Sequence, residues 1–247
     1  MNKPIWPSGN RLLASLPHAA LGRCMAELEQ VTLTTGQFLE RAGSELSEIV
    51  LVESGVLSIL AEAAGVSVEV GMIGRDGMTG LPAVFGCLRS SQSIVVQIAG
   101  SGLRITPARF KSLCERNPEL GALALRYCHA QIAQISHGGL ANARRTVTER
   151  LARWLLMCAD RASEVEFAVT HEMLSGALGV RRPGVTVATH ILEGEGAIKA
   201  RRGRITLIDR DRLESMANGC YGSPEREYDR LFVPPSLASS TPRSYVH

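Results

Sequence analysis

The chain has 247 residues, a length that suits two domains better than one. Its residues are 45% hydrophobic but only 4% aromatic, which argues against an enzyme cleft or an RNA-binding platform built on stacked rings. Lys and Arg outnumber Asp and Glu by 27 to 24. No apolar run approaches the length of a membrane span, and residues 1–10 lack the features of a signal peptide, so we expect a cytoplasmic protein.

The N-terminal half of the chain changes from a helical to a β-rich pattern. Leucines recur at helical spacing over residues 10–30, and Pro17 divides them into two short helices. From Val31 to Arg104, short β-rich runs alternate with glycines, which is typical of an antiparallel roll or barrel. The expected strands include 48–52, 56–60, 66–72 and 93–98.

A long helix is predicted to begin at Pro118 and to run to about His137, where Gly138-Gly139 predicts a flexible break. One set of its residues is spaced by three, four and three positions, as in a narrow coiled-coil seam. This candidate dimer seam consists of Leu125, Cys128, Ile132 and Ile135. The alternative is that the same stripe packs on the protein's own β domain.

Residues 170–195 have the pattern of two helices joined by a tight turn, following an amphipathic helix over 146–163. Thr170 is a suitable N-cap for the first helix, Gly179 suits the left-handed position that ends it, and the second begins at Arg182-Pro183. This is the geometry that places a second helix in the major groove of DNA. The outer face of that helix is expected to carry Arg181, Arg182, Thr186, Thr189 and His190, with Val185, Ala188, Ile191 and Leu192 facing inward.

A basic hairpin is predicted directly after the helix pair. Residues 197–200 and 204–208 form two short strands, and four basic residues lie between Lys199 and Arg204 with no acidic residue among them. Taken alone, this hairpin is simply a solvated turn. Next to a helix pair, it is better explained as a wing that contacts phosphates.

These C-terminal motifs resemble the Crp/Fnr family of bacterial transcription regulators. The resemblance covers 148–156, Leu178-Gly179-Val180-Arg181-Arg182, 192–196 and 202–209, in order and spacing. Looser similarity to a cyclic-nucleotide-binding roll extends over 36–37, 41–43, 50–55 and 77–80.

The resemblance implies an α+β fold, in which an N-terminal antiparallel β-roll is linked by a long dimerisation helix to a C-terminal winged helix-turn-helix. The expected boundaries are 10–117 for the sensing roll, 118–145 for the long helix, 146–220 for the DNA-binding domain and 221–247 for a flexible tail rich in Pro, Ser and charge. The implied partners are double-stranded DNA, a second copy of the chain and RNA polymerase, with no membrane.

The resemblance also implies which residues contact DNA. Arg182 takes the position of an arginine that reads a guanine edge, and Thr186 and Val187 are further base-reading candidates. The family's usual residues are replaced by Pro183 and Gly184 at the next two positions and by Val187 at a later arginine position, so the usual target sequence is not expected. The phosphate contacts are expected from Thr170, Arg181, His190, Lys199, Arg201, Arg202 and Arg204.

For the roll, the resemblance implies an effector pocket that would consist of Gly80, Leu81, Arg89, Ser90 and Ser91. In relatives that bind cyclic AMP, a glutamate after the glycine accepts a hydrogen bond from the ribose hydroxyl. Leu81 stands at this position and cannot accept a hydrogen bond, so a bound ribose hydroxyl would lose its partner at a cost of about 1–3 kcal/mol. This disfavours a cyclic nucleotide as cofactor. An iron-sulfur centre is not expected because residues 1–86 contain only Cys24, and a haem ligand role for His18 or His129 is not favoured over a structural one.

Two other classes of function have less support in the sequence. The sequence has no hydrolase, Walker or dinucleotide motif, and His171-Glu172 lacks the second histidine of a zinc protease, so we do not expect an enzyme or a metal site. The alternative function is a ligand-binding or protein-interaction module whose helix-turn-helix has degenerated, because Gly184 costs about 1 kcal/mol in a helix relative to alanine. The six scattered cysteines are expected to be reduced and mostly buried.

Overall fold

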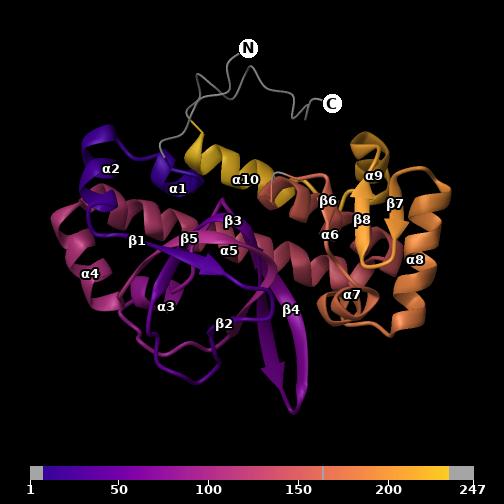
Figure 1. Ribbon diagram of the computed structural model, residues 1–247, viewed down its shortest axis with the longest axis horizontal. Coiled ribbons are helices and arrows are strands. Elements are labelled where there is room, and N and C mark those ends of the chain that lie inside the picture. The colour runs from indigo at the N-terminus through magenta and orange to yellow at the C-terminus, as the bar shows by residue number, and fades with distance from the viewer. Residues whose placement is uncertain (1–7, 163, 234–247) are drawn as a thin grey trace.

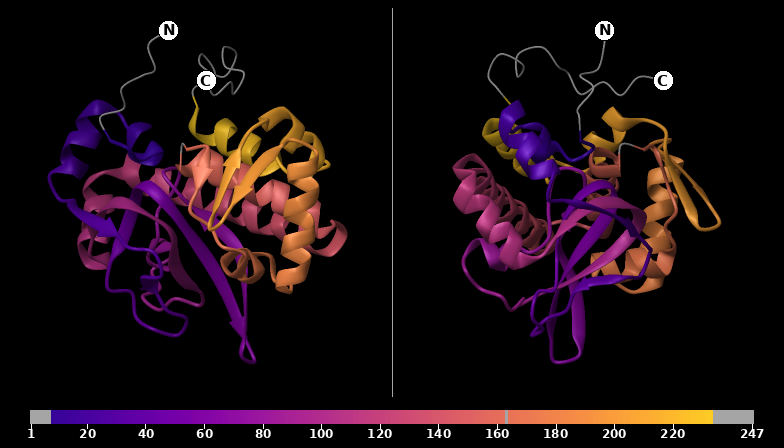
Figure 2. Two further views of the ribbon diagram at one scale, coloured as in Figure 1. Left: turned by 45° about the vertical axis from the view of Figure 1, so that its right-hand side comes forward. Right: turned by 60° about the vertical axis from the view of Figure 1, so that its left-hand side comes forward.

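The computed structural model describes residues 8–162 and 164–233, and it has three parts (Figure 1). An N-terminal β-roll with its covering helices is followed by one long helix, and a smaller helical domain with its own sheet completes the chain (Figures 1 and 2). The predicted α+β fold is therefore confirmed. Within the described residues, no helix combines the length and the hydropathy that are needed to cross a membrane.

Two short helices precede the roll, as predicted, and they are α1 (Arg11–Ala14) and α2 (His18–Met25). The buried Asn10 attaches α1 to the roll. Its side-chain oxygen accepts hydrogen bonds from the backbone N–H groups of Leu12 and Leu13, and its side-chain nitrogen donates to the carbonyls of Val52 and Gly77, both at 2.8 Å. One amide therefore caps the helix and fixes its position on the sheet.

The roll is an antiparallel sheet in which neighbouring strands follow the order β1-β5-β3-β4, with β2 also paired to β5. The strands are β1 (Glu29–Leu33), β2 (Phe38–Glu40), β3 (Ile49–Ala63), β4 (Val66–Ile73) and β5 (Ser93–Ile105). The β3–β4 hairpin extends beyond the rest of the roll (Figures 1 and 2).

The prediction of two strands at 48–52 and 56–60 was wrong, because the single strand β3 covers both. Gly55 was expected to be a turn. It instead lies inside the strand with φ 85°, and the pairing with β5 shifts register on either side of it. A Cβ at Gly55 would lie 2.5 Å from the carbonyl oxygen of Ile98, so the glycine permits a bulge in a continuous strand.

Helix α3 (Leu81–Val84) lies between β4 and β5, and α4 (Pro107–Arg116) precedes α5 (Pro118–Arg144). Helix α5 spans 27 residues, passes the expected end near His137 and ends one residue before the expected boundary at 145. The expected break at Gly138-Gly139 does not occur. Gly138 is buried, and a Cβ there would lie 3.4 Å from the carbonyl oxygen of Val70 on β4. A side chain at this position would make only an ordinary contact, and the helix continues through both glycines because its packing outweighs their low helix propensity.

The C-terminal helical domain consists of α6 (Val147–Ala162), β6 (Glu166–Phe167), α7 (His171–Leu178), α8 (Arg182–Gly194), β7 (Ile198–Arg201), β8 (Arg204–Leu207) and α9 (Arg210–Met216). Its core surrounds the fully buried Leu151, Leu155 and Leu192. The same core cluster also includes Val56 and Met72 of the roll. The helical domain therefore packs directly against the roll.

The predicted flexible tail contains a further helix, α10 (Ser223–Phe232), which packs along α5. Tyr228 is buried against the helices of the roll, its ring lies 4.6 Å from that of Phe232, and the Arg11 guanidinium lies 5.0 Å from its centre. An ion pair between Arg11 and Asp229, at 3.4 Å, joins the same helix to α1. A few apolar anchors order this segment despite its polar composition, and the remainder of the predicted tail, 234–247, lies outside the described residues.

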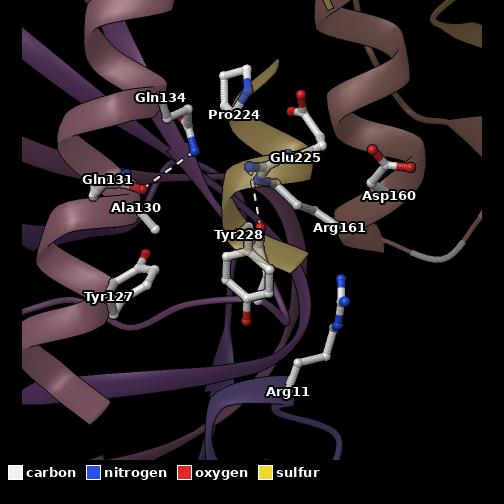
Figure 3. Close-up of a pocket in the computed structure, with 11 residues that line it drawn as sticks. Arg11, Tyr127, Ala130, Gln131, Gln134, Asp160, Arg161, Pro224, Glu225 and Tyr228 are labelled. Carbon is white, nitrogen blue, oxygen red and sulfur yellow. Dashed lines mark hydrogen bonds and ion pairs between the residues drawn. The ribbon is translucent and has the colours of Figure 1, made fainter. Parts of the chain in front are cut away.

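An ion pair inside the molecule joins α6 to the roll. The Arg161 guanidinium contacts Asp76 at 3.1 Å, with side chains only 5% and 14% exposed, and a Cβ at Gly74 would lie 2.3 Å from the Cβ of Arg161. Burial lowers the pKa of Arg161, but the carboxylates of Asp76 and Glu225 outweigh this effect and raise it. Figure 3 shows the surrounding side chains from three helices, which include Tyr127, Gln131 and Gln134 of α5, Asp160 of α6, and Glu225 and Tyr228 of α10.

We predict that Asp76→Ala destabilises the protein by about 3 kcal/mol, because it leaves a buried guanidinium without its nearest carboxylate. Urea denaturation followed by circular dichroism measures this change. The matched control is Glu29→Ala, which removes an exposed partner of Arg104 and should change stability by less than about 1 kcal/mol. Equal effects of the two substitutions would contradict the prediction.

Candidate nucleic-acid interface

Local sequence signals explain the pair of helices α7 and α8. The Thr170 side chain accepts a hydrogen bond from the N–H of Met173 at 3.2 Å and caps α7, and Gly179, with φ 61°, ends that helix. After one turn, α8 begins at Arg182 with Pro183 in its first turn, where a proline is tolerated. The 13-residue α8 is therefore complete despite Pro183 and Gly184.

The buried face of α8 differs from the prediction at two positions. Val185, Ala188 and Leu192 are buried as expected, but Thr189 is also buried and donates to the carbonyl of Val185 at 2.8 Å. Ile191, expected inside, is 45% exposed. The inward stripe follows the spacing i, i+3, i+4 and i+7, which includes residue 189 and excludes 191.

The three base-reading candidates lie on the exposed side of α8, near its N-terminus. The side chain of Arg182 is 66% exposed and Val187 is 59% exposed, whereas Thr186 is half-buried. Two residues that were not predicted contact them from the first turn of α7. Glu172 Oε2 lies 3.2 Å from Arg182 Nε, and His171 Nδ1 lies 3.1 Å from Thr186 Oγ1. Their position directly after the Thr170 cap was the available signal.

The basic hairpin lies beside α8, to which it is also bonded. Strands β7 and β8 pair on either side of Gly203, which has φ 73°, and the Glu193 carboxylate of α8 accepts from the N–H of Ala200 at 2.9 Å (Figure 1). All seven expected phosphate contacts are exposed, and these are Thr170, Arg181, His190, Lys199, Arg201, Arg202 and Arg204. Arg204 also forms an ion pair with Glu166 of β6 at 2.7 Å, which partly neutralises its charge.

Two of the expected effector residues of the roll, Gly80 and Ser90, meet at the buried carboxylate of Glu40, whereas Arg89 and Ser91 are exposed. Arg89 is exposed and donates to the carbonyl of Gly43 at 3.1 Å, Ser90 is buried and donates to the carbonyl of Gln92 at 2.8 Å, and Ser91 is exposed. Leu81 belongs to α3 and packs against the core between the roll and its helices.

A carboxylate of the chain itself lies at Gly80. The N–H of Gly80 donates to Glu40 Oε1 at 2.6 Å, and Glu40 is only 6% exposed. Burial raises the pKa of Glu40, while hydrogen bonds from Gly80 and Ser90 lower it. A cyclic phosphate at this position would have to displace a buried internal acceptor, so the residues present do not fit it. Glu40 was not predicted, because its distance from Gly80 in the sequence conceals the contact.

The candidate dimer seam is divided between two faces of α5. Leu125 is 53% exposed and Ile132 is 60% exposed, whereas Cys128 is 4% exposed and packs against the protein's own core, and Ile135 is half-buried. Cys128 therefore belongs to the inward stripe of α5, which for this residue agrees with the alternative that the stripe packs on the protein itself. Leu140, further along α5, is exposed to a similar degree as Leu125 and Ile132, at 59%.

The six cysteines carry no disulfide, and among the described residues no group of His, Cys, Asp and Glu is arranged to hold a metal ion. Three of them are buried, Cys114 and Cys220 are partly buried, and Cys87 is exposed. Burial raises the pKa of Cys114 and Cys128 to about 11, which keeps these thiols protonated.

A helix pair with an exposed basic face and an adjoining basic hairpin defines a class, the DNA-binding transcription regulators. The sequence model of the Crp-like helix-turn-helix domain matches residues 149–216. No curated protein matches the chain by sequence.

Several solved structures share the fold. FixK2 from Bradyrhizobium japonicum is 14% identical and covers 76% of this chain and 96% of its own, with a TM-score of 0.64. A CRP-family transcriptional regulator from Thermus thermophilus is 18% identical, with coverages of 79% and 99% and a TM-score of 0.63. The c-di-GMP responsive global regulator CLP from Xanthomonas campestris is 17% identical, with coverages of 78% and 99% and a TM-score of 0.63. The chain therefore contains a Crp-like helix-turn-helix domain, which supports a DNA-binding regulator, and it shares its fold with these solved structures, in agreement with the resemblance.

We predict that cyclic AMP at millimolar concentration does not raise the melting temperature of the protein, because Glu40 already occupies the N–H of Gly80. A ligand at a concentration of 100 times its Kd would stabilise the fold by about 2.7 kcal/mol, which a thermal shift assay detects easily. Linear AMP is the control for unspecific nucleotide effects. A saturable rise with cyclic AMP alone would show that the carboxylate yields to a phosphate.

Proposed function

We propose that the protein is a homodimeric transcription regulator that inserts α8 into the major groove of a palindromic DNA site. The observation that supports this most directly is the common exposure of Arg182, Val187 and the basic hairpin on one Crp-like helix-turn-helix domain. The complete α8 argues against the alternative, a degenerate domain that has lost DNA binding.

The exposed residues divide into two roles. Arg182 donates to the O6 and N7 atoms of a guanine, and Val187 contacts a thymine methyl group, so these residues carry sequence preference. Arg181, Lys199, Arg201 and Arg202 contact phosphates, which provide affinity and orientation without specificity.

The dimer uses the outer stripe of α5, which we define as Leu125, Ile132 and Leu140. These side chains are separated by seven and eight residues, which keeps them on one face of the helix. Pairing of two copies along this stripe joins two helical domains, whose α8 helices then contact half-sites about one DNA turn apart.

The remaining parts of the proposal follow from this role. A regulator that binds bacterial DNA works in the cytoplasm, and contact with RNA polymerase is supported by the resemblance alone. We assign no effector to the roll, because Gly80 and Arg89 are already bonded within the chain.

Selection from a random duplex library tests the function. We expect the wild type to enrich a palindrome, and Arg182→Ala to lose about tenfold or more of its discrimination at one base pair in each half-site. The control Arg202→Ala should weaken binding to all duplexes equally and reduce its salt dependence by about one phosphate contact. Failure of the wild type to enrich any sequence would contradict the proposed function.

A second prediction concerns the dimer. Two carboxylates introduced by Leu125→Asp and Ile132→Asp should prevent pairing, because they would be desolvated in the interface. Sedimentation should change from twice the chain mass of 26.6 kDa to the mass of one chain. Val66→Asp changes an equally exposed apolar residue on the roll and should leave the dimer intact. A dimer that persists in the double variant would exclude this stripe.

A further inference from the structure

Two side chains from the first turn of α7 contact residues of α8. Glu172 Oε2 contacts Arg182 Nε at 3.2 Å, and His171 Nδ1 contacts Thr186 Oγ1 at 3.1 Å. Thr186 Oγ1 also lies 3.2 Å from the carbonyl oxygen of Arg182. Two successive residues of one helix therefore contact two base-reading candidates of the next.

The contact between Glu172 and Arg182 contributes little to the stability of the fold. The two side chains are 72% and 66% exposed, and ion pairs at such positions are weak because water screens them. A carboxylate is also unfavourable near DNA, because it repels the phosphates. Neither stability nor affinity for phosphates accounts for Glu172, which leaves its effect on the side chain of Arg182.

The chemistry of the guanidinium explains that effect. Its five N–H donors form a planar fork, and the Glu172 carboxylate lies beside this fork on its Nε side as an ion-pair partner. The end of the group, with Nη1 and Nη2, remains available to donate to the O6 and N7 atoms of guanine in two parallel hydrogen bonds. Fixing the plane in advance lowers the entropy that a long, flexible side chain loses when it binds.

We propose that Glu172 is a positioning residue that orients Arg182 and thereby determines specificity at the base pair that Arg182 reads. This inference rests on the proposed function, since it requires Arg182 to contact a base. Glu172 favours discrimination over total affinity: it restricts Arg182 to one orientation and adds a negative charge near the phosphates.

The experiment uses the full-length protein and the duplex selected by the wild type. Fluorescence anisotropy gives Kd for this duplex, for the same duplex with the Arg182-read base pair replaced, and for an unrelated duplex. We expect Glu172→Ala to reduce the ratio between the first two by about fivefold, with binding to the unrelated duplex unchanged or tighter. Glu172→Gln should retain part of the ratio, because its amide oxygen can take the same place beside Nε without the negative charge.

Two further variants separate positioning from other roles. Glu195→Ala is the matched control, because Glu195 pairs with Arg212 on the same domain with side chains 49% and 51% exposed, and it should leave the ratio unchanged. In an Arg182→Ala background, Glu172→Ala should cause no further loss of discrimination, since the two residues act as one unit.

The outcomes distinguish this inference from the function on which it rests. A wild type that does not discriminate between the duplexes overturns both. Discrimination that depends on Arg182 but is unchanged in Glu172→Ala overturns only the positioning role. A uniform loss of affinity for all three duplexes in Glu172→Ala, with the ratio preserved, would show that Glu172 merely supports the fold and would also overturn it.

Discussion

The buried ion pair between Arg161 and Asp76 is the constraint on which the arrangement of the protein depends. A guanidinium inside a protein is tolerated only if carboxylates compensate its charge. Asp76 provides this from the turn after β4, and Glu225 of α10 adds a second negative charge nearby. The roll, α6 and α10 must therefore come together for Arg161 to be buried, which makes one side chain a test of the assembled fold (Figure 3).

A second set of polar contacts joins α5 and α6 to strand β4 of the roll. The indole of Trp154 on α6 donates to Glu69 at 2.9 Å, and Gln134 of α5 bonds both the N–H and the carbonyl of Met72, at 2.6 and 3.0 Å. Burial raises the pKa of Glu69 to about 7, while its hydrogen bonds with Ser58 and Trp154 lower it. These contacts hold α6 on the roll, and α6 in turn forms the core against which α8 packs.

The proposed DNA-binding face is built in the opposite way. Arg182, Val187 and the basic residues of the hairpin are exposed, and the only ion pair of Arg182 among the described residues is the solvent-exposed one with Glu172. The buried residues of α8 stabilise the domain, so the exposed residues of α8 can change without loss of the fold. This separation explains how Pro183 and Gly184 are tolerated in the first turn of α8, because Val185, Ala188 and Leu192 hold the helix in place.

The sequence by itself determined the elements whose signals are local. The cap at Thr170, the left-handed Gly179 and the early Pro183 define the helix pair, and spacing predicts the roll and the long helix. Only the tertiary structure decided which glycines end an element, so that Gly55 lies within a strand and Gly138 within a helix. It also ordered α10, turned Cys128 inward and placed Glu40 at Gly80 and Glu172 at Arg182. Caps and periodicity depend on neighbours within a few residues, whereas these outcomes depend on contacts between distant segments that no local pattern encodes.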